Sequence, residues 1–276
     1  MEQKDLTLQV LIAAMNQTDF SLIRSMNINA DAIMANQTDN TSNGEFEIEE
    51  HNVVVINSTF VGVGANRNLA LDNATADIVL FADDDMVYSD DMAQGVLQAF
   101  VDNPKADVMI FGCTETNSDG EVVMEYAHKN GKRFLFHTLR YPTYVIAARR
   151  SRLQKKKIRF SQMFGQGSCY GFGEDTVFLA DCFKKGLRVY SSEFNIGTST
   201  KEFRWFDGYN EKFFFSKGAL YKCIFGCLAP FACAYYSNKY SKTTGVSRKK
   251  INRYMEKGVE DYQKKVKLNN FQSDGM

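Results

Sequence analysis

The chain of 276 residues carries 33 Lys and Arg residues and 33 Asp and Glu residues, which gives a formal net charge of zero. Hydrophobic residues make up 44% and aromatic residues 13% of the chain, so a disordered protein is excluded and one large domain, alone or with a small appendage, is expected. This net charge of zero hides an uneven distribution of charge along the chain. Residues 1–125 carry 22 acidic and 4 basic residues, and residues 126–276 carry 11 acidic and 29 basic residues. A net charge of zero therefore does not exclude charged partners.

The N-terminus and the cysteines predict a cytosolic protein. The chain starts Met-Glu-Gln-Lys-Asp, without the basic region and cleavage site of a signal peptide. Its six cysteines form no Cys-x-x-Cys pair, as expected for reduced thiols. Residues 223–236 are uncharged and mostly apolar, but a membrane-spanning helix needs about 20 such residues. We expect a core helix or an interfacial helix there.

The first half of the chain alternates apolar runs with helix signals. Strands are predicted over 6–15, 30–35, 53–57, 78–82 and 108–112, with helices after Thr18 and Asp19, over 64–73, and after Ser89 as N-cap with Asp90 and Asp91 in the first turn. This alternation predicts right-handed crossovers and a doubly wound, mostly parallel α/β sheet. Ligands of such sheets bind beyond the carboxyl ends of the strands.

The second half has a different pattern. It predicts a hairpin over 114–126, strands over 133–138, 144–148 and 187–191, and a helix over 174–185 that ends at Gly186. From about residue 210 the pattern is helical and ends in a basic stretch and a polar tail. We therefore expect a C-terminal helical extension.

Three consecutive carboxylates follow the predicted strand over 78–82. Asp83, Asp84 and Asp85 repel one another, so stability alone does not favour them at a strand end. In extended geometry Asp83 and Asp85 point to the same side and can share a ligand. Carboxylate oxygens suit Mg²⁺ or Mn²⁺, so we predict a metal site at Asp83 and Asp85. A solvated acidic turn is the alternative.

Two classes of enzyme place Asp-x-Asp after a buried strand. Residues 83–87 fit the pattern of haloacid-dehalogenase-like phosphatases, but that class has its motif near the start of the fold and needs further acidic residues downstream. The segment Gly62-Val-Gly-Ala-Asn-Arg67 lacks the third glycine of a dinucleotide fingerprint, which disfavours a Rossmann oxidoreductase.

Four motifs, in this order along the chain, match the second class of enzyme that places Asp-x-Asp after a buried strand. They are Ala13-Ala-Met-Asn16 after the first strand, Gly62-Val-Gly-Ala-Asn-Arg67-Asn68, Asp83-Asp84-Asp85, and Gly173-Glu174-Asp175 at a helix start. With these motifs the sequence resembles the inverting family-2 glycosyltransferases of the GT-A fold, particularly those of bacterial capsular and exopolysaccharide assembly. The resemblance spans residues 6 to about 200 and implies a GT-A catalytic domain over 1–209. Residues 1–112 would bind the nucleotide-sugar, residues 113–209 the acceptor, and residues 210–276 would form a basic, aromatic helical region.

The resemblance also implies roles for particular residues. Asp175 would be the catalytic base, with Glu174 supporting it or binding the acceptor. The alternative is that both acids only stabilise the first turn of the helix, where its dipole favours negative charge. Asp83 and Asp85 would hold Mn²⁺ or Mg²⁺ against the donor diphosphate. Arg67 would steady a phosphate or orient the carboxylates, or else form a plain surface ion pair. The residues expected to bind the nucleotide-sugar are Ala13, Ala14, Asn16, Asn36, Gln37, Asp39, Arg67, Asp83 and Asp84.

Two positions depart from the family pattern. The usual acid pair at the end of the second strand is Asn36-Gln37 here, so the residue that reads the base stays open. Where the family often has a His, this chain has Gly197-Thr-Ser-Thr200. Ser199 and Thr200, together with Trp205, are expected to contact the acceptor or product.

The expected function is metal-dependent, inverting transfer of a hexose from a nucleotide-diphosphate sugar, UDP-sugar favoured, to a glycan or lipid-diphosphate-linked acceptor. The enzyme is expected in the cytoplasm. Its basic, aromatic second half suits an anionic membrane surface, which would attach it peripherally to the inner face of the plasma membrane; an ordinary helical subdomain with solvated lysines is the alternative. No nucleic-acid partner is expected, because no binding motif accompanies the charge. The alternatives are a nucleotidyl- or phosphotransferase that uses the same aspartates, and a non-catalytic membrane adaptor.

Overall fold

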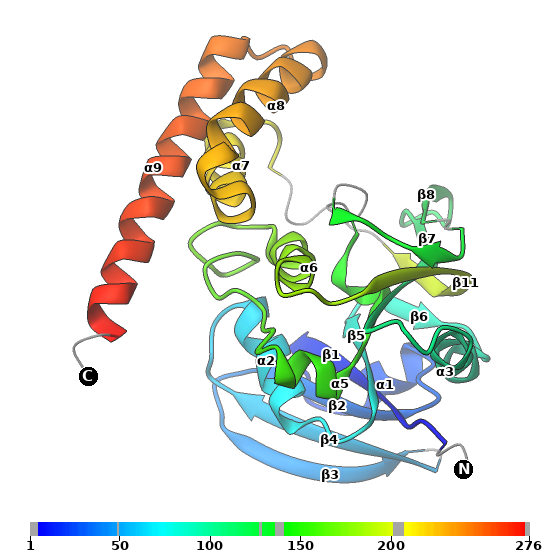
Figure 1. The fold of residues 1–276 in the computed structure, drawn as a ribbon. Helices are drawn as coiled ribbons and strands as arrows, with labels where there is room; N and C mark the ends of the chain where they lie inside the picture. Colours follow the sequence, from blue (N-terminus) through cyan, green and yellow to red (C-terminus); the bar gives the residue numbers. More distant parts are fainter. Residues whose placement is uncertain (1–4, 49, 127–128, 136–140, 201–206, 274–276) are drawn as a thin grey trace. The chain divides into compact units, whose positions relative to one another are not determined.

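The computed structural model describes residues 5–48, 50–126, 129–135, 141–200 and 207–273 (Figure 1). The chain forms two compact units. The first comprises residues 1–162 and 174–202, and the second comprises residues 163–173 and 203–276. The chain therefore leaves the first unit, returns to it at residue 174, and leaves it again at residue 203. The predicted division at residues 209 and 210 remains a prediction about domains.

A mixed sheet forms the first unit. Its strands run in the order β3-β4-β2-β1-β5-β10-β7-β11-β6, with β8 paired to β7 and β9 to β11. Neighbouring strands among β4, β2, β1 and β5 are parallel, whereas β10 is antiparallel to both β5 and β7. The strands are β1 Leu8–Met15, β2 Asp31–Gln37, β3 Ser42–Ile48, β4 His51–Ser58, β5 Ile78–Asp83, β6 Met86–Tyr88, β7 Val108–Thr116, β8 Val122–Tyr126, β9 Gly131–Lys132, β10 Ile146–Arg149 and β11 Val189–Thr200. This arrangement confirms the predicted α/β fold with a mostly parallel first half.

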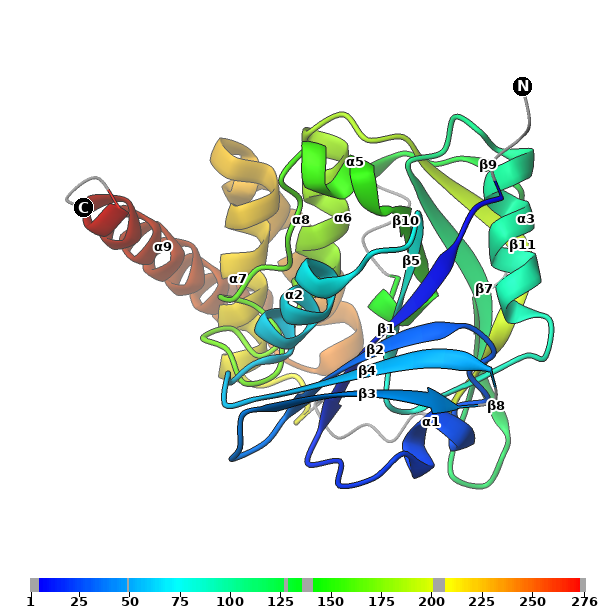
Figure 2. The same cartoon turned by 90° about the horizontal axis from the view of Figure 1, so that it is seen from below.

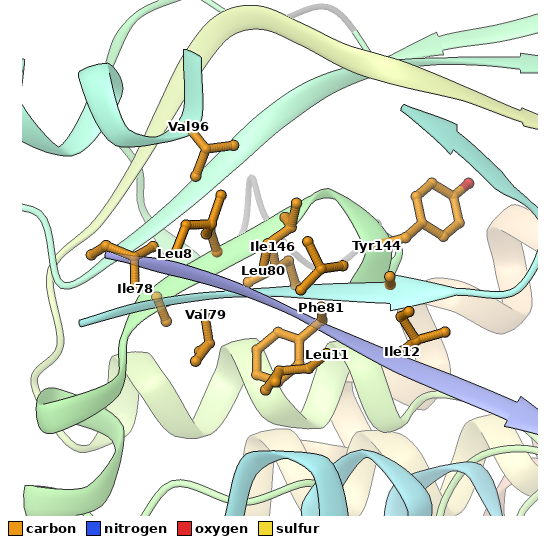
Figure 3. Packing of buried hydrophobic residues seen from close by; sticks show 14 of the residues in the cluster. Leu8, Leu11, Ile12, Ile78, Val79, Leu80, Phe81, Val96, Tyr144 and Ile146 are labelled. Carbon is orange, nitrogen blue, oxygen red and sulfur yellow. The ribbon is translucent and has the colours of Figure 1, made fainter. Parts of the chain in front are cut away.

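Helices cover both faces of this sheet. α2 and α6 lie over one face and α3 lies over the other (Figures 1 and 2). β5 is buried from Ile78 to Ala82, and its side chains alternate between the two faces: Phe81 packs on the side of α6, and Leu80 faces the side of Val96 on α3 (Figure 3). The helices are α1 Ser21–Ser25, α2 Val63–Asn73, α3 Met92–Asp102, α5 Arg150–Lys155 and α6 Glu174–Lys184, with a 3₁₀ turn, η1, over Thr143–Val145.

Several predicted elements differ from the structure. β3 was not predicted, because six of its seven residues are exposed or half-buried and the strand lacks an apolar face. α3 begins at Met92, with Asp91 at the N-cap position but without a capping hydrogen bond from its side chain. The prediction of Ser89 as N-cap with acids in the first turn is therefore wrong. Residues 133–135 form no strand, and the rest of the strand predicted over 133–138 lies outside the described residues. β11 continues to Thr200, nine residues beyond the predicted end.

The second unit is helical where it is described beyond residue 206. α7 Glu211–Phe225 and α8 Ala229–Thr244 are joined by a 3₁₀ turn, η2, over Gly226–Leu228, and α9 Arg248–Ser273 follows. Residues 163–173 pack within the same unit, since the Tyr170 hydroxyl donates to Asp261 Oδ2 at 2.8 Å and the rings of Phe164 and Tyr262 lie 5.8 Å apart. This confirms the predicted C-terminal helical region.

Two glycines set the distance between α7 and α9. A Cβ atom on Gly218 would lie 1.9 Å from the carbonyl oxygen of Met255, and one on Gly258 would lie 1.9 Å from that of Phe215. Both obstacles are backbone atoms, so the helices would have to separate to admit a methyl group.

We expect Gly218→Ala to destabilise the protein by about 1–3 kcal/mol, the usual cost of overpacking, although alanine is the better helix former. Urea unfolding followed by circular dichroism measures this. Gly171→Ala is the matched control, because nothing lies within 4 Å of its added Cβ atom. Equal or greater stability of Gly218→Ala would contradict the close helix contact.

Candidate active site

The three aspartates lie where β5 turns into β6. Asp83 is the last residue of β5 and pairs with Ala13 on β1, while Asp84 and Asp85 form the turn to Met86. The extended geometry assumed for Asp83 and Asp85 is therefore wrong, because the chain turns between them. The aspartates still lie at the carboxyl ends of β1 and β5, where parallel sheets bind ligands.

Arg67 on α2 joins this turn to α6. Its Nη2 donates to Asp83 Oδ1 at 2.5 Å and its Nη1 to Glu174 Oε1 at 2.9 Å. The Arg67 side chain is only 4% exposed, so the predicted alternative of a surface ion pair is wrong. Burial alone would lower the pKa of Arg67, but the charges of Asp83 and Glu174 more than offset this effect and raise it. The guanidinium group is permanently charged and bridges two carboxylates that lie 91 residues apart in the sequence.

The neighbours of Arg67 anchor the helix. Asn66 Nδ2 donates to the carbonyl oxygens of Ala14 at 2.9 Å and Ala35 at 2.8 Å, at the ends of β1 and β2. Asn68 exchanges two hydrogen bonds with the backbone of Phe160. The Phe160 ring stacks on Phe178 of α6, with centroids 4.4 Å apart, and Arg67 lies over the Phe160 ring at 5.4 Å. The two buried asparagines on either side of Arg67 thus hold this part of α2 in place.

Negative charge accumulates around Asp85. Although Asp85 is exposed to solvent, the protein atoms around its carboxyl group, with the charges of Asp83, Asp84 and Glu115, raise its pKa to about 7. The hydroxyl of Tyr88, whose pKa burial and the nearby Asp83 raise, is buried and makes no hydrogen bond within the described part of the chain. Such an excess of negative charge suits a bound cation.

The described residues would supply only part of a metal coordination shell. Among the described residues no three His, Cys, Asp or Glu side chains come together as ligands for one ion. Mg²⁺ commonly binds through one or two carboxylates and the phosphate groups of a substrate. Asp83 and Asp85 fit that arrangement, and their role as metal ligands stays a prediction.

Glu115 on β7 is a site residue that the sequence did not reveal. It is 1% exposed, and the hydroxyl groups of Tyr126, at 3.1 Å, and Tyr144 donate to the same oxygen, Oε1. Burial and the charge of Glu115 raise the pKa of both tyrosines, and the charge of Asp175 adds to the effect at Tyr126. The charge of Glu115 also contributes to the raised pKa of Asp85. Its strand pattern resembles any buried strand, so only the tertiary structure identifies it.

The predicted base, Asp175, lies in the first turn of α6 beside Glu174. Its Oδ1 accepts from the backbone nitrogen of Thr176 at 2.6 Å and from the Thr176 hydroxyl at 3.1 Å. Burial and the charge of Glu174 raise the pKa of Asp175 to about 6, above its ordinary value, although Thr176 and Arg67 act in the opposite direction. A raised pKa makes the ionised Asp175 carboxylate a stronger base than that of an ordinary aspartate.

The predicted nucleotide residues occupy the ends of β1 and β2. Ala13 and Ala14 are buried on β1, and Asn16 follows it with a φ of 55° and donates to Gln37 O at 2.9 Å. Asn36 is buried, and its two amide hydrogens go to Gln17 O at 2.8 Å and Asn57 Oδ1 at 2.7 Å. Asn36 therefore positions the loop after β1.

The remaining predicted nucleotide residues lie nearer the surface. Gln37 is half-buried and accepts from Gly62 N at 3.2 Å, and Asp39 is exposed. Because both amide hydrogens of Asn36 are used, Gln37 and Asp39 are the more available candidates for reading the base. A pocket of about 180 Å³ lies beside them. Its lining includes Gln17 and Asn57 but none of the predicted nucleotide residues.

The end of β11 lies against the carboxylate turn. Ser199 pairs with Met86 on β6 and with Glu115 on β7, and Thr200 N donates to Asp85 O at 3.2 Å. The structure thus places Ser199 and Thr200 next to Asp85. A contact with the acceptor or product, as expected from the sequence, requires such a position. Trp205, the third predicted contact, lies outside the described residues.

Comparisons with known proteins agree with this geometry. The model of the family described as Glycosyl transferase family 2 matches residues 34–166, which include Arg67 and the three aspartates and stop before Glu174. No curated protein sequence matches the chain.

Solved structures of S. aureus TarS have a similar fold. Residues 1–349 of TarS in complex with UDP-GlcNAc match with a TM-score of 0.62 at 15% sequence identity, over 87% of this chain and 74% of TarS 1–349. The same fragment in complex with UDP gives 0.59 at 14% identity, over 87% and 73%. S. aureus TarS itself gives 0.60 at 15% identity, over 87% and 44%.

These findings confirm the resemblance to the family-2 glycosyltransferases, the GT-A fold and an enzyme of the glycosyltransferase class. Neither the family match nor the fold tests the roles predicted for the individual site residues.

Removing the Arg67 guanidinium leaves Asp83 and Glu174 without their shared countercharge. We expect Arg67→Met to reduce the free energy of unfolding by about 3–5 kcal/mol, as for other buried pairs that lose one partner. Arg67→Lys should be intermediate, because an ammonium group keeps the charge but not the fork that reaches both carboxylates.

The matched control is Arg159→Met. Arg159 pairs with Asp72 at 2.5 Å, but the two side chains are 50% and 49% exposed, so the loss should stay below about 1 kcal/mol. Chemical denaturation of the three variants provides the measurement. Equal losses for Arg67→Met and Arg159→Met would show that the Arg67 bridge does not hold the site together.

Proposed function

We propose that this glycosyltransferase moves a hexose, with inversion, from a nucleotide-diphosphate sugar to a glycan or lipid-diphosphate-linked acceptor in polysaccharide biosynthesis. One observation carries the proposal: Arg67 bridges the aspartate turn to the first turn of α6, so the candidate metal ligands and the candidate base belong to one assembly. A UDP-sugar is favoured, because TarS, which shares the fold, is known in complex with UDP-GlcNAc.

The donor diphosphate would bind at the aspartate turn. Mn²⁺ or Mg²⁺ held by Asp83 and Asp85 would supply positive charge to the diphosphate as it departs. Arg67 fixes the orientation of Asp83, and the raised pKa of Asp85 favours a site that gains a cation. Asp84, which is exposed in the turn, and the ends of β1 and β2 would contact the nucleoside.

Asp175 would take the proton of the attacking acceptor hydroxyl. Thr176 fixes the Asp175 carboxylate through Oδ1, which leaves Oδ2 for the acceptor. Glu174 is held by Arg67 and therefore acts through the position and basicity of Asp175. Ser199 and Thr200, next to Asp85, are the proposed contacts to the product or acceptor.

Substitutions should separate the two roles. Asp85→Ala is expected to abolish the rise in melting temperature that UDP produces with Mn²⁺, whereas Asp175→Asn should keep this rise and lose transfer by about 10²–10⁴-fold. Asp119→Ala, an exposed aspartate in the β7–β8 turn, is the matched control and should change neither. Full transfer by Asp175→Asn would refute the assignment of the base.

The pH dependence offers a second test of Asp175. A base must be ionised to act, and its pKa is about 6, so kcat/KM should be level above that value and fall about tenfold per pH unit below it. The profile is to be measured at saturating Mn²⁺, which keeps Asp85 ionised. A rate that stays constant down to pH 4.5 would be inconsistent with Asp175 as the base.

The reaction products distinguish the proposal from a transferase that uses the same aspartates on phosphorus. Glycosyl transfer from a nucleoside-diphosphate sugar releases the nucleoside diphosphate. Transfer of the sugar phosphate releases the nucleoside monophosphate, and nucleotidyl transfer releases the sugar phosphate, or pyrophosphate when the donor is a nucleoside triphosphate. A panel of UDP-, GDP- and dTDP-sugars, with and without Mn²⁺, should release the diphosphate from one donor. Failure of every nucleotide to raise the melting temperature would remove the support for a donor site.

A further inference from the structure

The outer face of α8 carries an exposed stripe that the proposed reaction does not use. Leu228 at the start of the helix is 59% exposed, Phe231 is 75% exposed and Tyr235 is 66% exposed. Positions spaced by three and four residues lie on one side of a helix, so these side chains form one face. Lys239 and Lys242 continue the same spacing and are exposed. We call these five residues the α8 stripe. Cys233 and Ser237, on the opposite side, are buried.

The stripe is not part of a membrane-spanning helix. By length and composition alone, the stretch Glu211–Thr244 is apolar enough to cross a membrane, with a mean hydropathy of 1.3. Within it, however, the chain turns back at η2. The rings of Tyr221 and Tyr236 stack at 4.7 Å, and those of Tyr209 and Tyr240 lie 5.7 Å apart, so α7 and α8 are antiparallel. Their lengths of 15 and 16 residues are below the about 20 residues that a span requires.

Positive charge surrounds the polar end of the stripe. α8 contains no acidic residue, and Arg248, Lys249 and Lys250 are exposed directly after it, at the start of α9. Residues 207–273 together carry 13 basic and 5 acidic residues.

Ion pairs engage two of these five acids, because Glu211 pairs with Lys257 at 3.0 Å and Asp261 with Lys265 at 2.9 Å. Glu256 and Glu260 line a pocket with Cys233, on the side of α8 opposite the stripe. Asp207, the fifth acid, is exposed ahead of α7. α8 itself contributes no acidic residue to the face that carries the stripe.

We propose that the α8 stripe is a docking surface for an anionic lipid bilayer. Leu228 and Phe231 would enter the boundary between headgroups and acyl chains, and Tyr235 would lie at headgroup depth, where its ring and its hydroxyl both find suitable surroundings. Lys239, Lys242 and the start of α9 would contact lipid phosphates. An apolar half followed by a basic half matches a bilayer surface better than a nucleic acid, which has no apolar layer. This proposal is independent of the proposed transfer reaction.

The test is sedimentation of the full chain with vesicles of pure phosphatidylcholine and of phosphatidylcholine with 30% phosphatidylglycerol. The wild-type protein should bind the anionic vesicles, and the binding should weaken with salt. Leu228→Ser/Phe231→Ser/Tyr235→Ser should reduce the partition coefficient at least about tenfold, because each apolar side chain loses its burial. Lys239→Gln/Lys242→Gln should reduce it about tenfold or more on anionic vesicles, since each lysine contributes about 1 kcal/mol near such a surface.

Matched variants control for composition. Val122→Ser/Val123→Ser removes exposed apolar side chains from β8, and Lys155→Gln/Lys156→Gln removes two exposed lysines at the end of α5. Both should bind vesicles like the wild type, and circular dichroism should show that all variants are folded. Equal binding of the stripe variants and their controls would overturn the proposal. A second outcome would also overturn it: the wild-type protein binds neither kind of vesicle, light scattering shows that it forms an oligomer, and the triple Ser variant does not form this oligomer. The stripe would then bind a second copy of the chain.

Discussion

The candidate site depends on one buried guanidinium group. Asp83 ends a strand in the middle of the sheet and Glu174 begins a helix 91 residues later, and Arg67 binds both. Without this charge the two carboxylates would repel each other and Asp175 as well. With it, one arginine sets the relative position of the aspartate turn and the predicted base. The cost of burying Arg67 is offset by its two ion pairs, by Phe160 beneath it and by the hydrogen bonds of Asn66 and Asn68 that hold the helix.

The parts of the fold that bury apolar surface were predictable. The run Ile78–Ala82 is apolar and entirely buried, and the sequence signals for α2 and α6 agree with the structure to within a residue. β3 was not predictable, since it is a polar edge strand whose formation depends on pairing with β4. The sequence leaves open whether Asp84 and Asp85 form a turn or continue the strand, because three identical residues carry no pattern that separates the two.

The charged motifs of the candidate site were predictable from the sequence, but the residues that contact them were not. Arg67, the aspartates and the Glu174-Asp175 pair stand out in the sequence because they belong to the four ordered motifs that carry the family resemblance. Glu115 does not stand out, since its meaning comes from Tyr126, 11 residues away, and Tyr144, 29 residues away. The role of Asn36 likewise depends on contacts with Gln17 and Asn57 that a single sequence does not show. The burial of Arg67 excludes the alternative that it forms a plain surface ion pair. Burial is a property of the folded chain and could not be read from the sequence.

The path of the chain between the two units has a consequence for how they communicate. Residues 163–173 pack with α9 through Tyr170 and Phe164, and the next residue is Glu174. The segment leading into the predicted base is thus built into the C-terminal unit, although the base itself belongs to the N-terminal one. The 11 residues 163–173 therefore join the C-terminal unit directly, through the backbone, to the helix that carries the predicted base.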